Sequence, residues 1–65
     1  MNERQELILN IIIKEYIETA VPISSNLLVE KYKLDISSAT VRNEMAELEA
    51  SGYIMQPHTS SGRIP

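Results

Sequence analysis

The sequence predicts a mostly α-helical fold that ends in a small β-hairpin. In three separate stretches, apolar residues recur at steps of three and four, which is the spacing of one face of a helix. A small hydroxyl or amide residue precedes each stretch and can cap a helix there. After Gly52 the helical spacing stops, and short apolar segments flank a turn-rich loop. These observations predict three helices followed by a hairpin.

A chain of 65 residues is enough for one small domain, which we assign to residues 1–65. A domain near this size buries only about 60% of the surface that its unfolded chain exposes. The sequence has no cysteine, so neither a disulfide nor a thiolate zinc site can reinforce the core. Stability must therefore come from a compact helical core, from a longer parent chain or from an oligomer.

The first helix is expected over residues 3–19. Asn2 and Gln5 have the spacing of a capping box, in which two side chains satisfy backbone N–H groups reciprocally. Val21 and Pro22 then end the helix, because proline disfavours the helical conformation of the residue before it. The expected apolar stripe consists of Leu7, Ile8, Ile11, Ile12, Tyr16 and Ile17. The polar residues expected mainly on the other side are Glu3, Lys14, Glu15 and Glu18.

The second helix is shorter and is expected over residues 25–33. Either Ser24 or Ser25 can serve as its N-cap, because both hydroxyls can accept a hydrogen bond from the first turn. The side of this helix that we expect to be buried consists of Leu27, Leu28, Val29 and Tyr32.

The third helix is expected over residues 38–51, with Ser37 or Ser38 as its N-cap. Gly52 is well placed to follow it in the left-handed conformation that commonly ends a helix. The apolar stripe predicted for this helix consists of Val41, Met45 and Leu48.

Residues 53–65 suggest the hairpin. The stretch "YIMQP" is typical of a short strand, "HTSSG" of a turn-rich loop, and "RIP" of the start of a returning strand. Three helices followed by such a hairpin, or wing, is the element order of a winged helix-turn-helix domain. This is the fold that the sequence predicts.

The outward side of the third helix carries residues suited to DNA. Opposite the predicted core stripe, at 100° per residue, lie Ala39, Asn43 and Ala46, with Thr40 and Arg42 beside them. A recognition helix places such side chains of its first turns in the major groove. Arg42 can bind guanine bidentately and Asn43 can bind adenine, while the small Ala39 permits close approach. The hydroxyls of Ser38 and Thr40 suit phosphates or bases. A solvated face with an ordinary capping serine is the alternative interpretation.

Two further places could contact DNA. Ser25 can cap its helix and also bind a phosphate at the helix N-terminus. In the hairpin loop, His58 and Arg63 could reach a narrow minor groove with Thr59 between them, and Gly62 would allow a turn or a close approach. A flexible loop or a linker explains the same loop composition, so both interpretations stay open.

The net charge is evidence against DNA binding, but the distribution of the charges along the chain weakens that evidence. Nine acidic residues against six lysines and arginines give a formal net charge of −3, whereas nucleic-acid-binding domains usually carry a basic surface. All the acidic residues lie between Glu3 and Glu49, so residues 50–65 contain none. The alternative function is a winged-helix protein-interaction module, with the first helix and residues 53–65 as its partner surface.

Other function classes have little support. The most apolar stretch, residues 7–17, is shorter than the ~20 residues that span a bilayer, and no signal peptide is recognisable. We therefore expect a soluble, cytoplasmic protein. One histidine, no cysteine, no glycine-rich phosphate loop and no evident pair of pocket carboxylates indicate that the chain is not an enzyme. No metal or cofactor is implied.

Residues 37–65, "SSATVRNEMAELEASGYIMQPHTSSGRIP", closely resemble the N-terminal domain of the HrcA family of bacterial heat-inducible transcription repressors. The family run is similar to S-x-A-T-[IV]-R-N-x-M-x-x-L-E-x-x-G-Y-[LI]-x-Q-P-H-T-S-[AS]-G-R-[IV]-P. Residues 4–32 follow the first two helices of that family. The chain departs from the family where Ala20 and Val21 precede Pro22 and where Ser24 and Ser25 follow Ile23, and Asn26 replaces a frequent basic residue.

The resemblance implies a repressor of heat-shock (chaperone) genes that binds double-stranded DNA at an inverted-repeat operator, the CIRCE element. It also implies a homodimeric parent protein whose activity the chaperonin GroEL supports. Family proteins are much longer, so dimerisation and sensing regions would follow Pro65. A segment of this length is then expected to bind DNA weakly and as a monomer.

Overall fold

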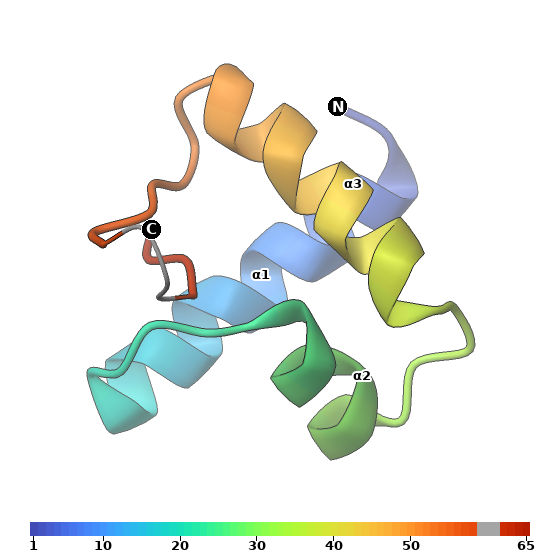
Figure 1. The fold of residues 1–65 in the computed structure, drawn as a ribbon, viewed down its shortest axis with the longest axis horizontal. Coiled ribbons are helices and arrows are strands. Elements are labelled where there is room, and N and C mark those ends of the chain that lie inside the picture. The colour runs from blue at the N-terminus through green and yellow to red at the C-terminus, as the bar shows by residue number, and fades with distance from the viewer. Residues whose placement is uncertain (59–61) are drawn as a thin grey trace.

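Three helices form the structure, a computed structural model that describes residues 1–58 and 62–65. They are α1 (Glu3–Thr19), α2 (Ser25–Tyr32) and α3 (Ser38–Ala50), and α3 packs against both of the others (Figure 1). The fold is mostly α, as predicted. The last two helices each end one residue earlier than expected.

Each helix begins at a capped residue. Asn2 Oδ1 accepts from the Gln5 N–H at 2.8 Å and the Asn2 N–H donates to Gln5 Oε1 at 3.2 Å, so the predicted capping box is confirmed. Ser24 and Ser37 cap the other two helices, which settles the choice within each serine pair. Gly52 follows α3 with a φ of +85°, the left-handed conformation expected there.

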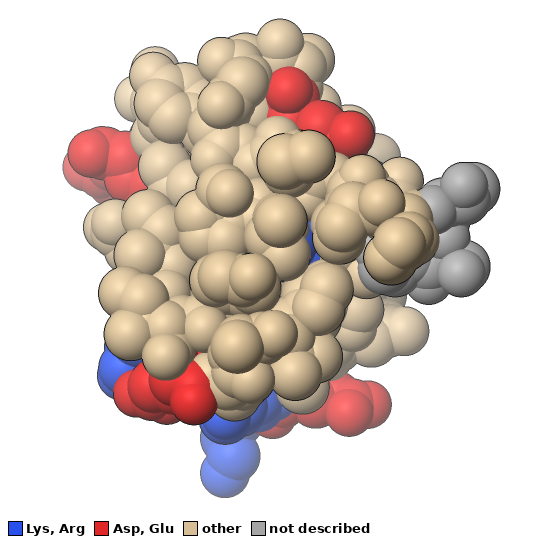
Figure 2. All heavy atoms as spheres, turned by 90° about the vertical axis from the view of Figure 1, so that its left-hand side faces the viewer, with Lys and Arg blue, Asp and Glu red and all other residues tan. Residues whose placement is uncertain are grey.

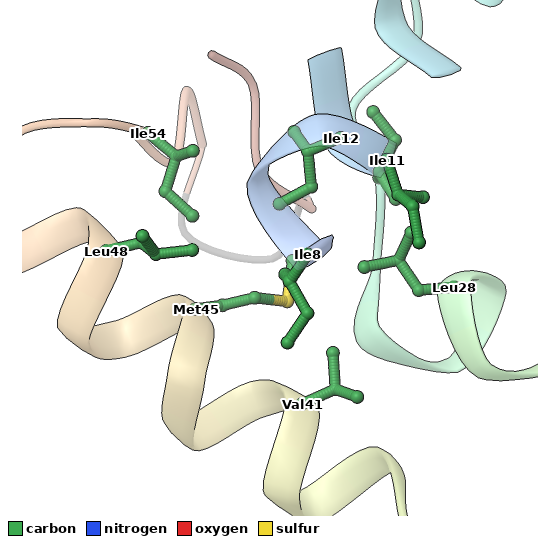
Figure 3. Packing of buried hydrophobic residues seen from close by; sticks show 9 residues of the cluster. Ile8, Ile11, Ile12, Leu28, Val41, Met45, Leu48 and Ile54 are labelled. Carbon is green, nitrogen blue, oxygen red and sulfur yellow. The ribbon is translucent and has the colours of Figure 1, made fainter. Parts of the chain in front are cut away.

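The core lies where the three helices and the flanking loops meet (Figure 3). Ile8 of α1, Leu28 of α2 and Val41 of α3 are completely buried. The predicted stripe of α3 is confirmed in full, and that of α1 and α2 in part. The complete set of buried apolar residues is Ile8, Ile11, Ile12, Ile23, Leu28, Val41, Met45, Leu48 and Ile54.

The predicted stripe of α1 was too wide. Leu7 is 49% exposed and Ile17 is 77% exposed, because α2 and α3 cover only one narrow arc of this helix. Leu27 of α2 is also exposed, so the buried side of that helix centres on Leu28. Glu15 was expected on the polar side but is only 2% exposed.

Glu15 is buried because α2 supplies two donors for its carboxylate. Lys31 Nζ and the Tyr32 hydroxyl each donate to a different Glu15 oxygen at 2.7 Å. These hydrogen bonds, led by that from Lys31, hold the pKa of Glu15 below its ordinary value against the opposing effect of burial. These contacts join α1 to α2 through the carboxylate of Glu15, which the sequence pattern had placed on the surface.

The expected hairpin is not seen: the described residues contain no β-strand. Two isolated antiparallel bridges are present instead, one joining Ile23 to Arg63 and the other joining Met55 to Ile64. Each pair exchanges two backbone hydrogen bonds of 2.8–2.9 Å. The C-terminal segment therefore lies between two neighbours, with Arg63 paired to the chain before α2 and Ile64 paired to Met55 on the other edge, and each pairing is one residue pair long.

Gly62 makes the bridge to Ile23 possible. A Cβ atom at position 62 would lie 2.4 Å from the backbone carbonyl carbon of Ile23, closer than nonbonded atoms can approach. The expectation that this glycine permits a close backbone approach is confirmed. The contact fixes the C-terminal segment beside the start of α2.

Candidate nucleic-acid interface

The outer side of α3 is exposed along its first turns. Ala39, Arg42 and Asn43 are exposed, whereas Ser38 and Thr40 are half-buried. The Ser37 hydroxyl donates to the Thr40 hydroxyl oxygen at 3.1 Å, so part of the hydrogen-bonding capacity of Thr40 is used within the helix cap. Arg42 and Asn43 are therefore the long polar side chains that this surface offers to a ligand.

The acidic residues of α3 are engaged elsewhere. Glu44 is only 8% exposed and accepts from Arg4 Nη1 at 3.3 Å and from Gln5 Nε2 at 3.2 Å. Gln5 Nε2 also donates to Glu47 at 2.9 Å. Because these partners belong to α1, two carboxylates of α3 point towards the first helix and away from the exposed first turns.

Arg63 contacts the flank of α3 that faces the C-terminal segment. Its Nε donates to Glu49 Oε1 at 2.8 Å, and its side chain is only 19% exposed. The sequence predicts that Arg63 contacts DNA, which stays a prediction; in the structure its side chain is ion-paired with Glu49 of α3. In contrast, Arg42 forms no ion pair with any residue that the structure describes.

Three of the predicted residues come together around one hollow of about 310 Å³. Ser25 from α2, Arg42 from α3 and Arg63 from the C-terminal segment all line it. Ser25 is 9% exposed and sits in the first turn of α2, next to the cap residue Ser24. Sequence spacing could not indicate this grouping, because it depends on the bridge between Ile23 and Arg63.

The other predicted residues are more dispersed. His58 is exposed in the segment that follows the bridge residue Met55. Thr59 lies outside the described residues. Sequence reasoning did not include Gln56, which also lines the hollow, because only the folded C-terminal segment brings it beside α2.

Residues 1–58 and 62–65 offer neither a metal-binding cluster nor a membrane-spanning helix. These residues include no cluster of three or more histidine, cysteine, aspartate or glutamate side chains arranged to hold a metal ion. None of the three described helices combines the length and the apolar composition that crossing a bilayer requires.

Comparison with known proteins shows close relatives. No family model matches the chain. Proteins described as "Heat-inducible transcription repressor HrcA" match all 65 residues, with 60% identity in Desulforamulus reducens, 54% in Chloroflexus aurantiacus and 55% in Acetivibrio thermocellus. The chain covers 18–19% of the length of these relatives.

A solved structure shares the fold. A crystal structure of a hypothetical protein superimposes with a TM-score of 0.93 and 52% sequence identity. The match covers 100% of this chain and 21% of that one. The arrangement described above is thus similar to one segment of a longer, experimentally determined chain.

Proposed function

The chain is related over its whole length to the N-terminal part of the HrcA heat-inducible transcription repressors, and on this premise we propose that it is a DNA-binding segment of such a repressor. The observation that carries the proposal is the division of charge on α3. Arg42 and Asn43 are exposed near its start, while Glu44, Glu47 and Glu49 hold partners in other segments.

In this proposal the first turns of α3 enter the major groove. Ala39, Thr40, Arg42 and Asn43 face the DNA there, and Ser25 and Ser38 contact the sugar-phosphate backbone. The segment that contains His58, Thr59 and Arg63 lies against the neighbouring DNA in the manner of a wing. The order of the helices and the antiparallel bridge between Met55 and Ile64 support a winged-helix arrangement.

We extend the proposal to the longer protein through its relatives. The operator would be an inverted repeat of the CIRCE type in front of heat-shock genes, and two copies of the chain would read its two halves. By the same resemblance, we propose that the longer protein is a cytoplasmic homodimer and that the chaperonin GroEL supports its activity. No catalytic activity is proposed, because the relatives are described as repressors.

Amide NMR spectra of the chain, recorded while a CIRCE-type duplex is added, test the proposed surface. We expect the largest shifts at residues 38–43 and at the start of α2, because these backbone amides lie nearest the DNA. The C-terminal turns of α1 serve as the internal control and should change little. Shifts concentrated on α1, with residues 38–43 unchanged, would rule out the proposed orientation.

A second candidate function is a protein-interaction module. Figure 2 shows that the side of the molecule bearing the end of α1 and the C-terminal segment has charged residues mainly at its margins. Exposed apolar side chains on these segments include Ile17, Tyr53 and Met55. Exposed apolar patches of this kind commonly bind other proteins. This candidate predicts a salt-insensitive protein complex and no binding to DNA.

A further inference from the structure

The hollow beside the start of α2 has the features of a phosphate site. Its walls come from several separate segments, namely residues 23–26 at the start of α2, Arg42 and Met45 of α3, Gln56, and the C-terminal residues 62–63. The segments are held together by the bridge between Ile23 and Arg63 and by the close approach of Gly62. The hollow is thus built by tertiary contacts and is not a gap along one helix.

Hydrogen-bond donors without acceptors line one wall. The N–H groups of Leu27 and Leu28 both donate to the cap residue Ser24, at 3.1 and 3.2 Å. The preceding N–H groups, those of Ser25 and Asn26, have no acceptor among the described residues. The first-turn amides of a helix point at whatever lies before its N-terminus and favour an anion there.

The side chain of Ser25 is a second and independent indication. This residue is more than nine-tenths buried, lines the hollow, and makes no side-chain hydrogen bond with any residue that the structure describes. The described residues contain no fully buried side-chain nitrogen or oxygen without a hydrogen-bond partner, so the unpartnered hydroxyl oxygen of Ser25 is the part of this side chain that stays accessible. Because Ser24 already caps the helix, the hydroxyl of Ser25 is available to a ligand in the hollow.

The positive charge is supplied from α3. Arg42 and Arg63 both line the hollow, but Arg63 is paired with Glu49 at 2.8 Å. Arg42 has no such partner among the described residues. Arg42 and Glu49 are also seven residues apart, or about two helical turns, so both lie on the flank of α3 that faces the C-terminal segment.

We infer that this hollow binds one phosphate group of the DNA backbone, held by Arg42, the Ser25 hydroxyl and the free amides of the first turn of α2. The inference rests on the proposed DNA-binding function and changes the role of Arg42 within it. Sequence reasoning assigned Arg42 to a guanine base, whereas its position on the flank of α3 assigns it to the backbone. Base recognition is then left to Asn43 and the smaller residues around it.

The test measures the affinity of the 65-residue chain for an inverted-repeat duplex and for a scrambled duplex, by fluorescence anisotropy over a series of salt concentrations. The variants are Arg42→Ala and Ser25→Ala. Lys14→Ala is the matched control, because it removes one exposed positive charge from α1, outside the hollow. Circular dichroism melting curves check that each variant is folded.

We expect Arg42→Ala to weaken binding to both duplexes by a similar factor, about tenfold, as loss of a charge-assisted hydrogen bond does. The log–log salt slope should fall by about 1, which is the effect of removing one phosphate contact. Ser25→Ala should weaken both duplexes alike without changing the slope, and Lys14→Ala should change little. If Arg42→Ala instead abolishes the preference for the repeat and leaves the salt slope unchanged, Arg42 reads a base and the inference is wrong.

Failure of the proposed function would be recognised separately. If the wild-type chain binds neither duplex, inorganic phosphate is added while the amide NMR spectrum is recorded. If phosphate shifts the Ser25 and Asn26 amides in the wild type but not in Arg42→Ala, the hollow binds phosphate. The phosphate site would then stand although the DNA-binding proposal had failed. An unchanged spectrum would overturn the site as well.

Discussion

The residues on the inner side of α3 are required for packing, whereas those on its outer side are not. Its inner side consists of Val41, Met45, Leu48 and the buried Glu44, and each of these residues is covered by neighbouring segments. Its outer side carries Ala39, Arg42 and Asn43, which are exposed. The inner side follows the 3.6-residue period of a helix that must bury one stripe. The outer side is not needed for that packing and is available for a ligand.

The proposed DNA binding has to be reconciled with the acidic composition of the chain. A net charge of −3 opposes binding only if the negative charges face the phosphates. On α3 the carboxylates of Glu44 and Glu47 are engaged by α1, and that of Glu49 is engaged by Arg63. The composition of a small domain is therefore a weaker guide to its ligand than the side of the helix on which each charge lies.

The largest effect is expected from truncation of the inner side. Leu48→Ala removes a buried side chain and should lower the free energy of unfolding by about 2–5 kcal/mol, through lost burial and the cavity left behind. Urea titration followed by circular dichroism measures this loss. Ile17→Ala is the matched control, because Ile17 is exposed and its truncation should cost less than about 0.5 kcal/mol. Equal losses in the two variants would contradict the assigned core.

Truncation of an outer side chain should weaken DNA recognition and leave the free energy of unfolding almost unchanged. Asn43→Ala should reduce the preference for the operator over a scrambled duplex by about 1–3 kcal/mol, the value of one good base contact. The free energy of unfolding should change by no more than about 0.5 kcal/mol, because Asn43 is exposed. Anisotropy and urea titrations of the same sample measure both quantities, with Asn10→Ala on α1 as the exposed control. A loss of unfolding free energy as large as that of Leu48→Ala would show that Asn43 is needed for packing and would contradict its assignment to the outer side.

Removal of the ion pair between Glu44 and Arg4 should cause an intermediate loss of stability. Glu44→Gln removes the negative charge but keeps an oxygen that can accept from α1, so the free energy of unfolding should fall by about 1 kcal/mol. Operator binding should be nearly unchanged, because this carboxylate faces α1. Glu30→Gln, at an exposed position of α2, controls for the change in net charge. A strong gain in DNA affinity in Glu44→Gln alone would show that Glu44 faces the DNA.

The last prediction concerns the pH dependence of stability and involves Glu15, which is bonded to α2. Its hydrogen bonds from Lys31 and Tyr32 lower its pKa in the folded chain. The stabilisation is therefore complete above the pKa of the unfolded chain, and it is lost as the pH falls through the lowered folded pKa. Unfolding titrations across the acidic range should show this decline in the wild type and a flatter curve in Glu15→Gln. Parallel curves for both proteins would contradict the assignment.

Local features of this fold were predictable from sequence, and features that depend on distant contacts were not. The capping box of Asn2 and Gln5, the left-handed Gly52 and the stripe of α3 each depend on neighbours within one or two turns. The burial of Glu15 depends on donors from α2.

The same limit applies to the candidate site. The exposed positions of Arg42 and Asn43 followed from helical geometry, because the buried stripe of α3 was recognisable. The ion pair of Arg63 and the hollow around Ser25 could not be predicted, since both depend on the bridge between Ile23 and the C-terminal segment. The pattern of residues 53–65 indicates a hairpin and contains no sign that Ile23, before α2, pairs with Arg63.

Recognition of a specific DNA sequence through the outer side of α3 is the function that we propose for this chain. Its most direct test is an anisotropy titration of the wild-type chain with a CIRCE-type inverted repeat and with a scrambled duplex, each at low and at moderate salt. We predict tighter binding to the repeat, weakened by salt with a log–log slope of about −0.9 for each phosphate contact. Equal affinity for both duplexes, in this chain and in a longer chain that includes the region after Pro65, would contradict the proposed function.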